Sequence, residues 1–196
     1  MSSKIGVENI AHTNGTNAMT IDSSGVATFP NPPVGAFIAE ADQFRLTANV
    51  ANAGSVYLIS ANMGSATFER VDNAAFSKIG TGMTNSSGTF TFPRTGLYRI
   101  AVVAHIYIPS GNDGAAGVDT YFSNDNFSST QHLATAWAGS SAGGQWYGTH
   151  SSECFVNVTN ISTNKIRFAT NSMAATTLVG SSTINQTSFS FIRLGA

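Results

Sequence analysis

The sequence predicts an all-β protein, built as a two-sheet sandwich that follows a short N-terminal hairpin. Apolar residues recur at every second position, and β-branched and aromatic residues stand in short runs bounded by Gly, Asn, Ser and Pro. No segment has the 3.6-residue apolar period of an amphipathic helix. The length of 196 residues suits one domain with a small appendage.

The first predicted element is the hairpin. Two alternating runs, 18–22 and 25–29, flank a turn at 22–25, in which Gly25 can supply a positive φ. A hairpin of this size buries too little apolar surface to be stable alone. We therefore expect it to rest on a partner surface.

A proline-rich linker follows the hairpin. The prolines between 30 and 33 have no N–H to donate to a sheet, so they end the hairpin and stiffen the connection. The sequence therefore predicts an N-terminal arm over 1–35 and a main domain over 36–196.

The main domain is predicted to be a sandwich of many short strands. Two of them have the clearest patterns: 97–108 is long and mostly apolar, and 187–194 alternates phenylalanine with serine. Both are expected to lie in the core. Loops rich in Gly and Ser are expected at 109–116 and 139–149. The full set of predicted strands is 36–40, 43–50, 55–60, 66–71, 88–92, 97–108, 117–123, 132–138, 153–159, 165–170 and 187–194.

One segment, 87–98 (SGTFTFPRTGLY), resembles the signature of the C1q/tumour-necrosis-factor jelly roll. Thr95 stands where that family usually has proline, and Pro93 comes two residues earlier. The segments 155–160, 165–168 and 187–194 are similar to the last strands of the same fold. The resemblance covers about residues 36–196 and implies three jelly rolls packed about an axis, which is a homotrimer. The residues on family positions are Gly88, Phe90, Thr91, Gly96 and Tyr98.

The N-terminal segment 15–30 (GTNAMTIDSSGVATFP) resembles a motif of tailed-bacteriophage fibre and head-decoration proteins. Together with the C1q-like domain, it resembles virion proteins of marine phages. The resemblance implies a place on the particle surface, with the arm bound to the major capsid protein or to another virion protein. The apolar arm residues expected to make this contact are Met19, Ile21, Val26 and Phe29.

Two functions remain open. The preferred one is a non-enzymatic, trimeric capsid decoration or head-fibre protein, because a short anchor with one compact domain suits a lattice point. The alternative is a tail-fibre or spike module that binds a host surface polysaccharide or protein. Its candidate contacts are Trp137, Trp146 and Tyr147 in the glycine-rich segment 137–147, since exposed aromatics stack on sugars or anchor in partner pockets. Equally, the two tryptophans could cap the end of the sandwich.

Composition excludes several classes of partner. Charged residues make up 10% of the chain, against about 25% in an ordinary soluble protein. The formal net charge is -1 and the basic residues form no cluster, so we expect no nucleic-acid partner. No run approaches the roughly 18 consecutive apolar residues of a membrane span, so we expect no membrane partner. A single cysteine and no apolar signal segment predict synthesis in the reducing host cytoplasm.

Catalytic and metal-binding patterns are weak. His150, Glu153 and Cys154 lie close in sequence, but a strand over 153–159 would make Cys154 a small buried hydrophobe. The remaining histidines lack metal-ligand spacing. The segment 111–114 with Asp119 offers oxygens for calcium, yet it lacks EF-hand spacing and is typical of a turn. The sequence therefore predicts no enzymatic activity, no cofactor and no metal.

Overall fold

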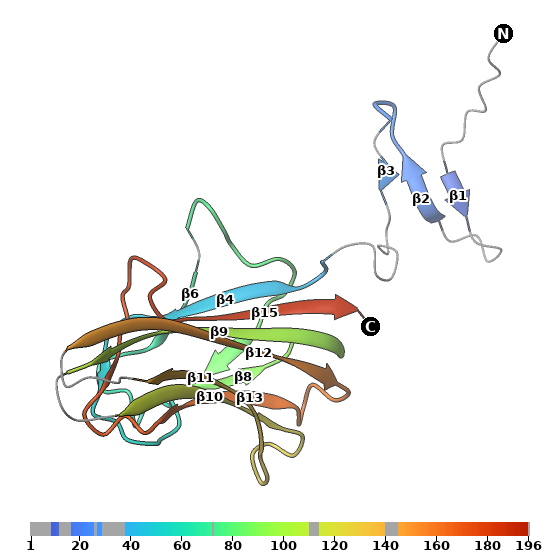
Figure 1. Ribbon diagram of the computed structural model, residues 1–196. Helices are drawn as coiled ribbons and strands as arrows, with labels where there is room; N and C mark the ends of the chain where they lie inside the picture. Colours follow the sequence, from blue (N-terminus) through green and yellow to red (C-terminus); the bar gives the residue numbers. More distant parts are fainter. Residues whose placement is uncertain are drawn as a thin grey trace. The chain divides into compact units, whose positions relative to one another are not determined.

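The computed structural model describes residues 9–11, 17–25, 27–28, 38–71, 73–109, 114–139 and 145–195. The chain forms two compact units, Met1–Phe37 and Ile38–Ala196. All the regular elements of the described residues are strands (Figure 1). Among these residues no helix is long and apolar enough to cross a membrane.

The first unit is a three-stranded antiparallel sheet of β1 (Asn9–Ala11), β2 (Asn17–Ile21) and β3 (Ala27–Thr28). Strands β2 and β3 form the predicted hairpin, which is confirmed, whereas β1 was not predicted. At the turn, the N–H of Gly25 donates to the carbonyl of Asp22 at 2.9 Å, and Gly25 adopts a φ of 81°. This left-handed φ explains why glycine stands there.

The second unit is a sandwich of two antiparallel sheets (Figure 1). The β10 sheet has the order β11-β10-β13-β8-β7. The β9 sheet has the order β12-β9-β15-β4-β6, and the short strands β14 and β5 extend it beside β9. The prediction of an all-β, two-sheet sandwich is therefore confirmed. The strands are β4 (Ala41–Leu46), β5 (Val50–Ala51), β6 (Phe68–Arg70), β7 (Thr84–Ser86), β8 (Thr89–Thr91), β9 (Gly96–Ile108), β10 (Ala115–Ser123), β11 (Gln131–Gly139), β12 (Trp146–Val158), β13 (Lys165–Asn171), β14 (Thr177–Leu178) and β15 (Ser188–Gly195).

The core lies between the two sheets. Every second residue of β9 is buried, as a strand with one face on a core requires. Aromatic rings from β15 meet rings from the opposite sheet: the centroids of Phe189 and Phe168 are 4.3 Å apart, and those of Phe191 and Phe90 are 5.1 Å apart. Burying each large apolar side chain contributes about 1.5–3 kcal/mol. The prediction that 97–108 and 187–194 contribute to the core is confirmed for one face of each strand, whereas Leu97 and Val103 lie on the outer face of β9.

The family signature marks positions with strict steric demands. Gly88 has a φ of 85°, and a Cβ there would overlap the carbonyl oxygen of Leu58. Gly96 has a φ of 130° and lies against the backbone of Gly195. Tyr98 is buried, and its hydroxyl donates to the carbonyl of Arg94 at 3.0 Å. Burial raises the pKa of this phenol to about 12.

Several predicted strands differ from the observed ones. Residues 38–40 are not strand, and β4 begins at Ala41. The side chain of Glu40 is a buried carboxylate that accepts a hydrogen bond from the N–H of Gly82. The predicted strand 55–60 forms only an isolated bridge between Tyr57 and Ala169. The three short strands β5, β7 and β14 were not predicted, since two or three residues carry too little periodicity to be recognised.

The largest difference concerns β12, which begins at Trp146 instead of residue 153. Its first half, up to Ser152, is rich in small polar residues with no apolar alternation, so the sequence resembles a loop. Continuous pairing with β9 from Trp146–Ile108 to Val158–Gly96 makes it a strand. Tertiary pairing thus overrides the weak local preference.

Candidate functional site

The three aromatic residues of the predicted binding loop lie on strands. Trp137 belongs to β11, and Trp146 and Tyr147 begin β12. Because successive side chains of a strand point to opposite faces, Trp146 turns inward and packs against the core, while Tyr147 is 60% exposed. Trp137 is 44% exposed, on the outer face of the β10 sheet. The three rings therefore do not form one binding loop.

Of the predicted arm contacts, Met19 and Ile21 are half-buried on β2. Val26 and Phe29 lie outside the described residues.

The outer face of the paired long strands β9 and β12 carries several exposed apolar side chains. We name it the β9–β12 face. Leu97 and Phe155 on it are 39% and 58% exposed, and Leu194 of the adjoining β15 is 46% exposed. Large exposed apolar side chains that gather on one face are typical of protein interaction sites. The residues of the β9–β12 face are Leu97, Arg99, Ala101, Val103, His105, Tyr107, Tyr147, Thr149, Ser151, Glu153, Phe155 and Asn157.

One end of the β9–β12 face is an aromatic stack. The rings of Tyr107 and Tyr147, which are direct cross-strand partners, lie 4.5 Å apart at an interplanar angle of 26°. His105 stacks on Tyr147 from the next pair at 6.0 Å, and its Nδ1 is 2.8 Å from the Thr149 hydroxyl. The side-chain amide of Gln145 donates to the Tyr107 hydroxyl at 2.7 Å. The stack is thus held in place before any partner binds.

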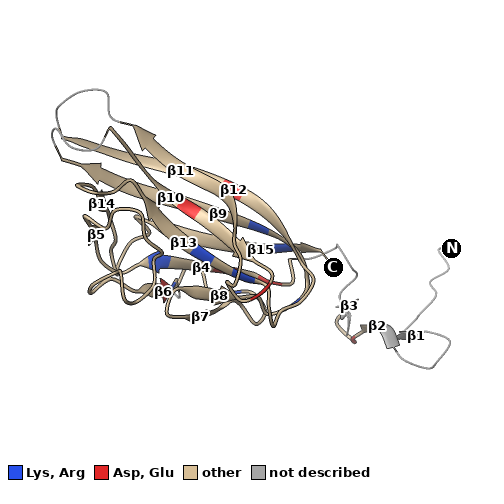
Figure 2. Ribbon diagram, turned by 90° about the horizontal axis from the view of Figure 1, so that it is seen from below, with Lys and Arg blue, Asp and Glu red and all other residues tan. Residues whose placement is uncertain are grey.

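Charge is sparse on this surface. Strands β9, β12 and β15 carry one Asp, Glu, Lys or Arg each, namely Arg99, Glu153 and Arg193. The first two form an exposed pair, in which Arg99 Nε donates to Glu153 Oε2 at 2.9 Å. Figure 2 shows most of β9, β11 and β12 without charge. An exposed ion pair contributes little, about 0–1 kcal/mol. The face therefore combines apolar and aromatic side chains with small polar ones and carries little charge, and charge is depleted in the cores of protein interfaces as well.

Two long strand edges lie beside this face. Within the described part of the chain, β12 pairs with β9 alone and β11 pairs with β10 alone. The two strands lie side by side at the same side of the sandwich (Figures 1 and 2). This side of the unit therefore offers backbone groups as well as an apolar face to a partner.

The catalytic candidates are separated. His150 and Cys154 share the inward face of β12, but four residues of strand place them about 13 Å apart, beyond hydrogen-bond reach. Burial, and next the negative charge of Glu153, raise the pKa of the Cys154 thiol to about 11. A protonated, half-buried thiol packed against the core matches the predicted small hydrophobe and is a poor nucleophile.

The candidate calcium ligands are the segment 111–114 and Asp119. Residues 111–113 lie outside the described residues, and Asp119 is buried in β10. The described ranges contain no group of three or more His, Cys, Asp or Glu side chains placed to hold a metal ion.

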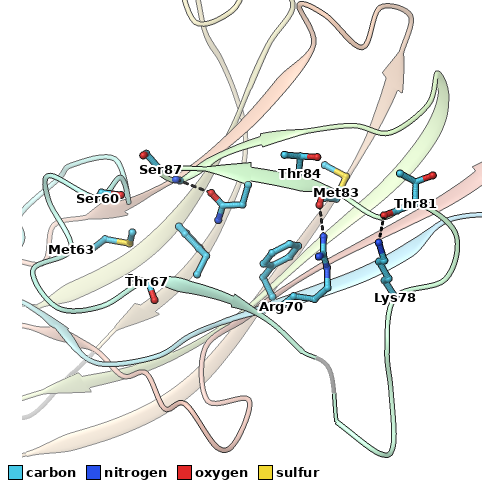
Figure 3. Close-up of a pocket in the computed structure, with 13 residues that line it drawn as sticks. Ser60, Met63, Thr67, Arg70, Lys78, Thr81, Met83, Thr84 and Ser87 are labelled. Atoms are coloured by element: carbon cyan, nitrogen blue, oxygen red, sulfur yellow. Dashed lines mark hydrogen bonds between the residues drawn. The ribbon is translucent and has the colours of Figure 1, made fainter.

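A hollow of about 660 Å³ opens near β6, β7 and the segment 78–88 (Figure 3). Its cationic side chains bind within the fold. Arg70 pairs with Asp42 at 3.0 Å and donates to the carbonyl of Met83, and Lys78 Nζ donates to the carbonyl of Thr81 at 2.7 Å. The bond from Arg70, a β6 residue, to Met83 holds the segment 78–83 against the β9 sheet, and the Lys78 bond closes the segment on itself. Both cationic side chains therefore have a structural role.

Comparisons with known proteins agree with the fold. No protein-family profile and no curated protein matches the sequence. The structure of Eiger TNF from S. frugiperda is similar at a TM-score of 0.56 and 12% identity, over 81% of this chain and 94% of that chain. A crystal structure of murine APRIL at pH 8.0 is similar at a TM-score of 0.52 and 11% identity, over 79% and 98%. The second unit therefore has the C1q/TNF-like jelly-roll fold that the signature predicted.

Proposed function

We propose that this chain is a non-enzymatic structural protein of a bacteriophage virion, a homotrimeric capsid decoration or head-fibre protein. The first unit attaches it to the major capsid protein or another virion protein, and the jelly roll is displayed on the particle surface. The observation that carries the proposal is the division of the chain into a small three-stranded unit and a complete sandwich. Strands of two to five residues form a unit that is marginally stable by itself, so this unit is better suited to binding a partner than to standing alone.

The β9–β12 face supports the trimer. Its exposed side chains Leu97 and Phe155, with Tyr147 at the other end, are costly to leave in water, and burying them between subunits recovers this cost. Arg99 and Glu153 are paired, so neither charge would be buried at such an interface without its partner. Static light scattering tests the trimer. A monomer at micromolar concentration with native circular dichroism would refute it.

Copy number tests the place on the particle. Quantitative mass spectrometry of purified particles should find hundreds of copies per virion for a decoration protein, because such a protein follows the capsid lattice. A few copies, or a few dozen, would favour a fibre.

The second candidate function is a tail-fibre or spike module that binds a host surface receptor. The exposure of Trp137 and Tyr147 favours it, since exposed aromatics dominate many binding surfaces. Adsorption of particles to host cells tests it. Substitution of Tyr147 and Trp137 by alanine should reduce adsorption at least tenfold in a receptor-binding module and leave it unchanged in a decoration protein.

A further inference from the structure

The outer face of the β10 sheet carries an ordered array of polar and aromatic side chains. Val118 and Ala116 point into the core, so the alternate residues Gly117, Asp119 and Tyr121 point outward. The pairing of β10 with β13 and β11 extends each of them into a cross-strand row. The three rows are Asn171-Gly117-Trp137, Ala169-Asp119-Thr135 and Arg167-Tyr121-His132.

Asp119 is the centre of this array. Its side chain is 4% exposed. Thr135 donates to Oδ1 at 2.7 Å, Asn171 Nδ2 donates to Oδ2 at 3.0 Å, and the Tyr121 hydroxyl donates to Oδ2 at 3.3 Å. His132 Nε2 lies 3.3 Å from Oδ1. A buried carboxylate requires such partners, and in return it fixes the orientation of every group around it.

A hollow of about 430 Å³ opens beside Asp119. The small side chain of Ala169 leaves room in it, and the segment 55–58 walls it by pairing with β13, where Leu58 N–H donates to the Phe168 carbonyl at 2.8 Å. The Tyr57 ring stands edge-on to Tyr121 at 5.4 Å. The hollow is lined by Ser55, Val56, Tyr57, Asn62, Asp119, Tyr121, Ala169, Thr170 and Asn171.

A third aromatic ring lies in the same array. Trp137 rests on Gly117, where a Cβ would come within 2.6 Å of the indole Cε3. The absence of a side chain at Gly117 lets the indole lie across the sheet, and 44% of Trp137 stays exposed. Gly117 and Asp119 are alternate residues of one strand, so the indole and the central carboxylate are in neighbouring rows.

The chemistry of this site selects the ligand. Both oxygens of Asp119 already accept hydrogen bonds, so they are poor ligands for a cation, and their negative charge opposes an anion. Asn171 and Tyr121 keep further hydrogen-bonding capacity, because an amide has two N–H groups and a phenol oxygen also accepts. Fixed polar groups beside the half-buried rings of Tyr57 and Tyr121 and the exposed ring of Trp137 match a ligand that alternates hydroxyl groups with apolar C–H faces. We propose that this hollow is a binding site for a neutral saccharide.

This site would supply the receptor contact that the second candidate function requires. The proposal rests on that function for the biological role of the site, not for its ability to bind a sugar. Its test uses the free, full-length protein, so failure would leave particle attachment and trimer formation unaffected. The probes are D-glucose, D-galactose, D-mannose and N-acetyl-D-glucosamine, observed by saturation-transfer NMR, with sodium phosphate as an anionic probe. A hexose has about 12 non-hydrogen atoms, so a Kd on the order of millimolar is expected.

The variants are Trp137→Ala and Tyr121→Phe, with Ile161→Ala as the control, an exposed apolar side chain in the turn between β12 and β13 that does not line the hollow. At least one sugar should bind the parent protein, and either site variant should weaken binding at least tenfold while Ile161→Ala leaves it unchanged. Tyr121→Phe removes one hydroxyl and keeps the ring, so it remains informative even if Trp137→Ala unfolds. No binding by any of the four sugars, binding of phosphate instead, or binding that survives Tyr121→Phe would overturn the proposal.

Discussion

The indole of Trp146 lies over the backbone of Gly148, two residues further along β12. A Cβ at Gly148 would overlap the six-membered ring of the indole. Beyond Gly148 the same ring approaches the imidazole of His150, at a centroid distance of 5.5 Å. The glycine therefore makes room for a tryptophan that packs against the core at the start of the strand.

Gly148→Ala should destabilise the protein by about 1–3 kcal/mol, because the indole must leave its site or the strand must shift. The midpoint of urea unfolding measures this loss. Gly114→Ala is the control, since nothing lies within 4 Å of a Cβ built there, and it should change stability by less than about 0.5 kcal/mol. Equal stability of the two variants would contradict the packing of Trp146.

Phe189→Ala should destabilise the protein by about 3–5 kcal/mol, because the ring is fully buried between the sheets and leaves a cavity. Thermal melting at several protein concentrations separates loss of folding from loss of association. Ile161→Ala removes a side chain that is 40% exposed and should melt close to the parent. A Phe189→Ala variant that melts like the parent would show that β15 is misplaced.

Phe155→Ser should weaken self-association at least tenfold and leave the subunit folded. The ring is 58% exposed on the β9–β12 face, so its loss removes apolar contact between subunits without opening the core. Light scattering over a dilution series measures the change. Trp137→Ala, on the outer face of the other sheet, should leave the oligomer intact. Dissociation caused by Trp137→Ala but not by Phe155→Ser would show that the interface is on the β10 sheet instead.

The Cys154 thiol should react slowly with iodoacetamide in the folded protein. Burial raises its pKa from 9.0 to about 11, so at pH 8 the thiolate is about a hundredfold scarcer than in the unfolded chain. Between these two pKa values the folded state binds more protons. The contribution of Cys154 to stability is therefore complete below pH 9 and is lost as the pH rises through 11. Equal alkylation rates in buffer and in urea would contradict this.

Removal of residues 1–35 should abolish attachment to the particle and leave the jelly roll folded, because the core of the second unit is built from residues after Ile38. Co-sedimentation with particles stripped of the native protein measures attachment, and circular dichroism checks the fold. The full-length protein is the control. Undiminished binding of the truncated chain would place the anchor in the jelly roll.

The long apolar strands of the sandwich could be predicted because the run or alternation of apolar residues that marks a strand lies within each segment's own sequence. Tyr98 and Phe191 are buried and alternate with less buried residues, and in 187–194 the alternation of phenylalanine with serine is visible in the sequence itself. The Asp119 array could not be predicted, because Asn171 is 52 residues away in sequence and the two meet only through the register of β10 and β13. The local signal was two small outward residues, Gly117 and Ala169. Glycine or alanine occurs in strands for many reasons, so these residues do not by themselves indicate a hollow on the sheet.

The aromatic segment shows the same limit. Trp146 and Tyr147 are adjacent, so a strand must send them to opposite sides, whereas a loop would allow them to act together. The first half of β12 is polar, and its pairing with β9 depends on residues 38 to 50 positions earlier, from Trp146–Ile108 to Ser152–Val102. The exposed aromatic residues could be predicted from the sequence, but the loop predicted at 139–149 was wrong from Trp146 on, where β12 begins.

No described residue pairs with the outer edge of β12, and this edge should make a subunit without its partners prone to aggregation. Alternate residues of this 13-residue strand present their N–H and C=O groups to the edge, and Glu153 is its one Asp, Glu, Lys or Arg. Soluble proteins usually guard such edges with lysine, proline or a bulge. Newly made chains should therefore either assemble or aggregate, and a higher concentration of free chains should favour aggregation. Slower expression should accordingly raise the yield of soluble protein more than a longer refolding time in vitro does.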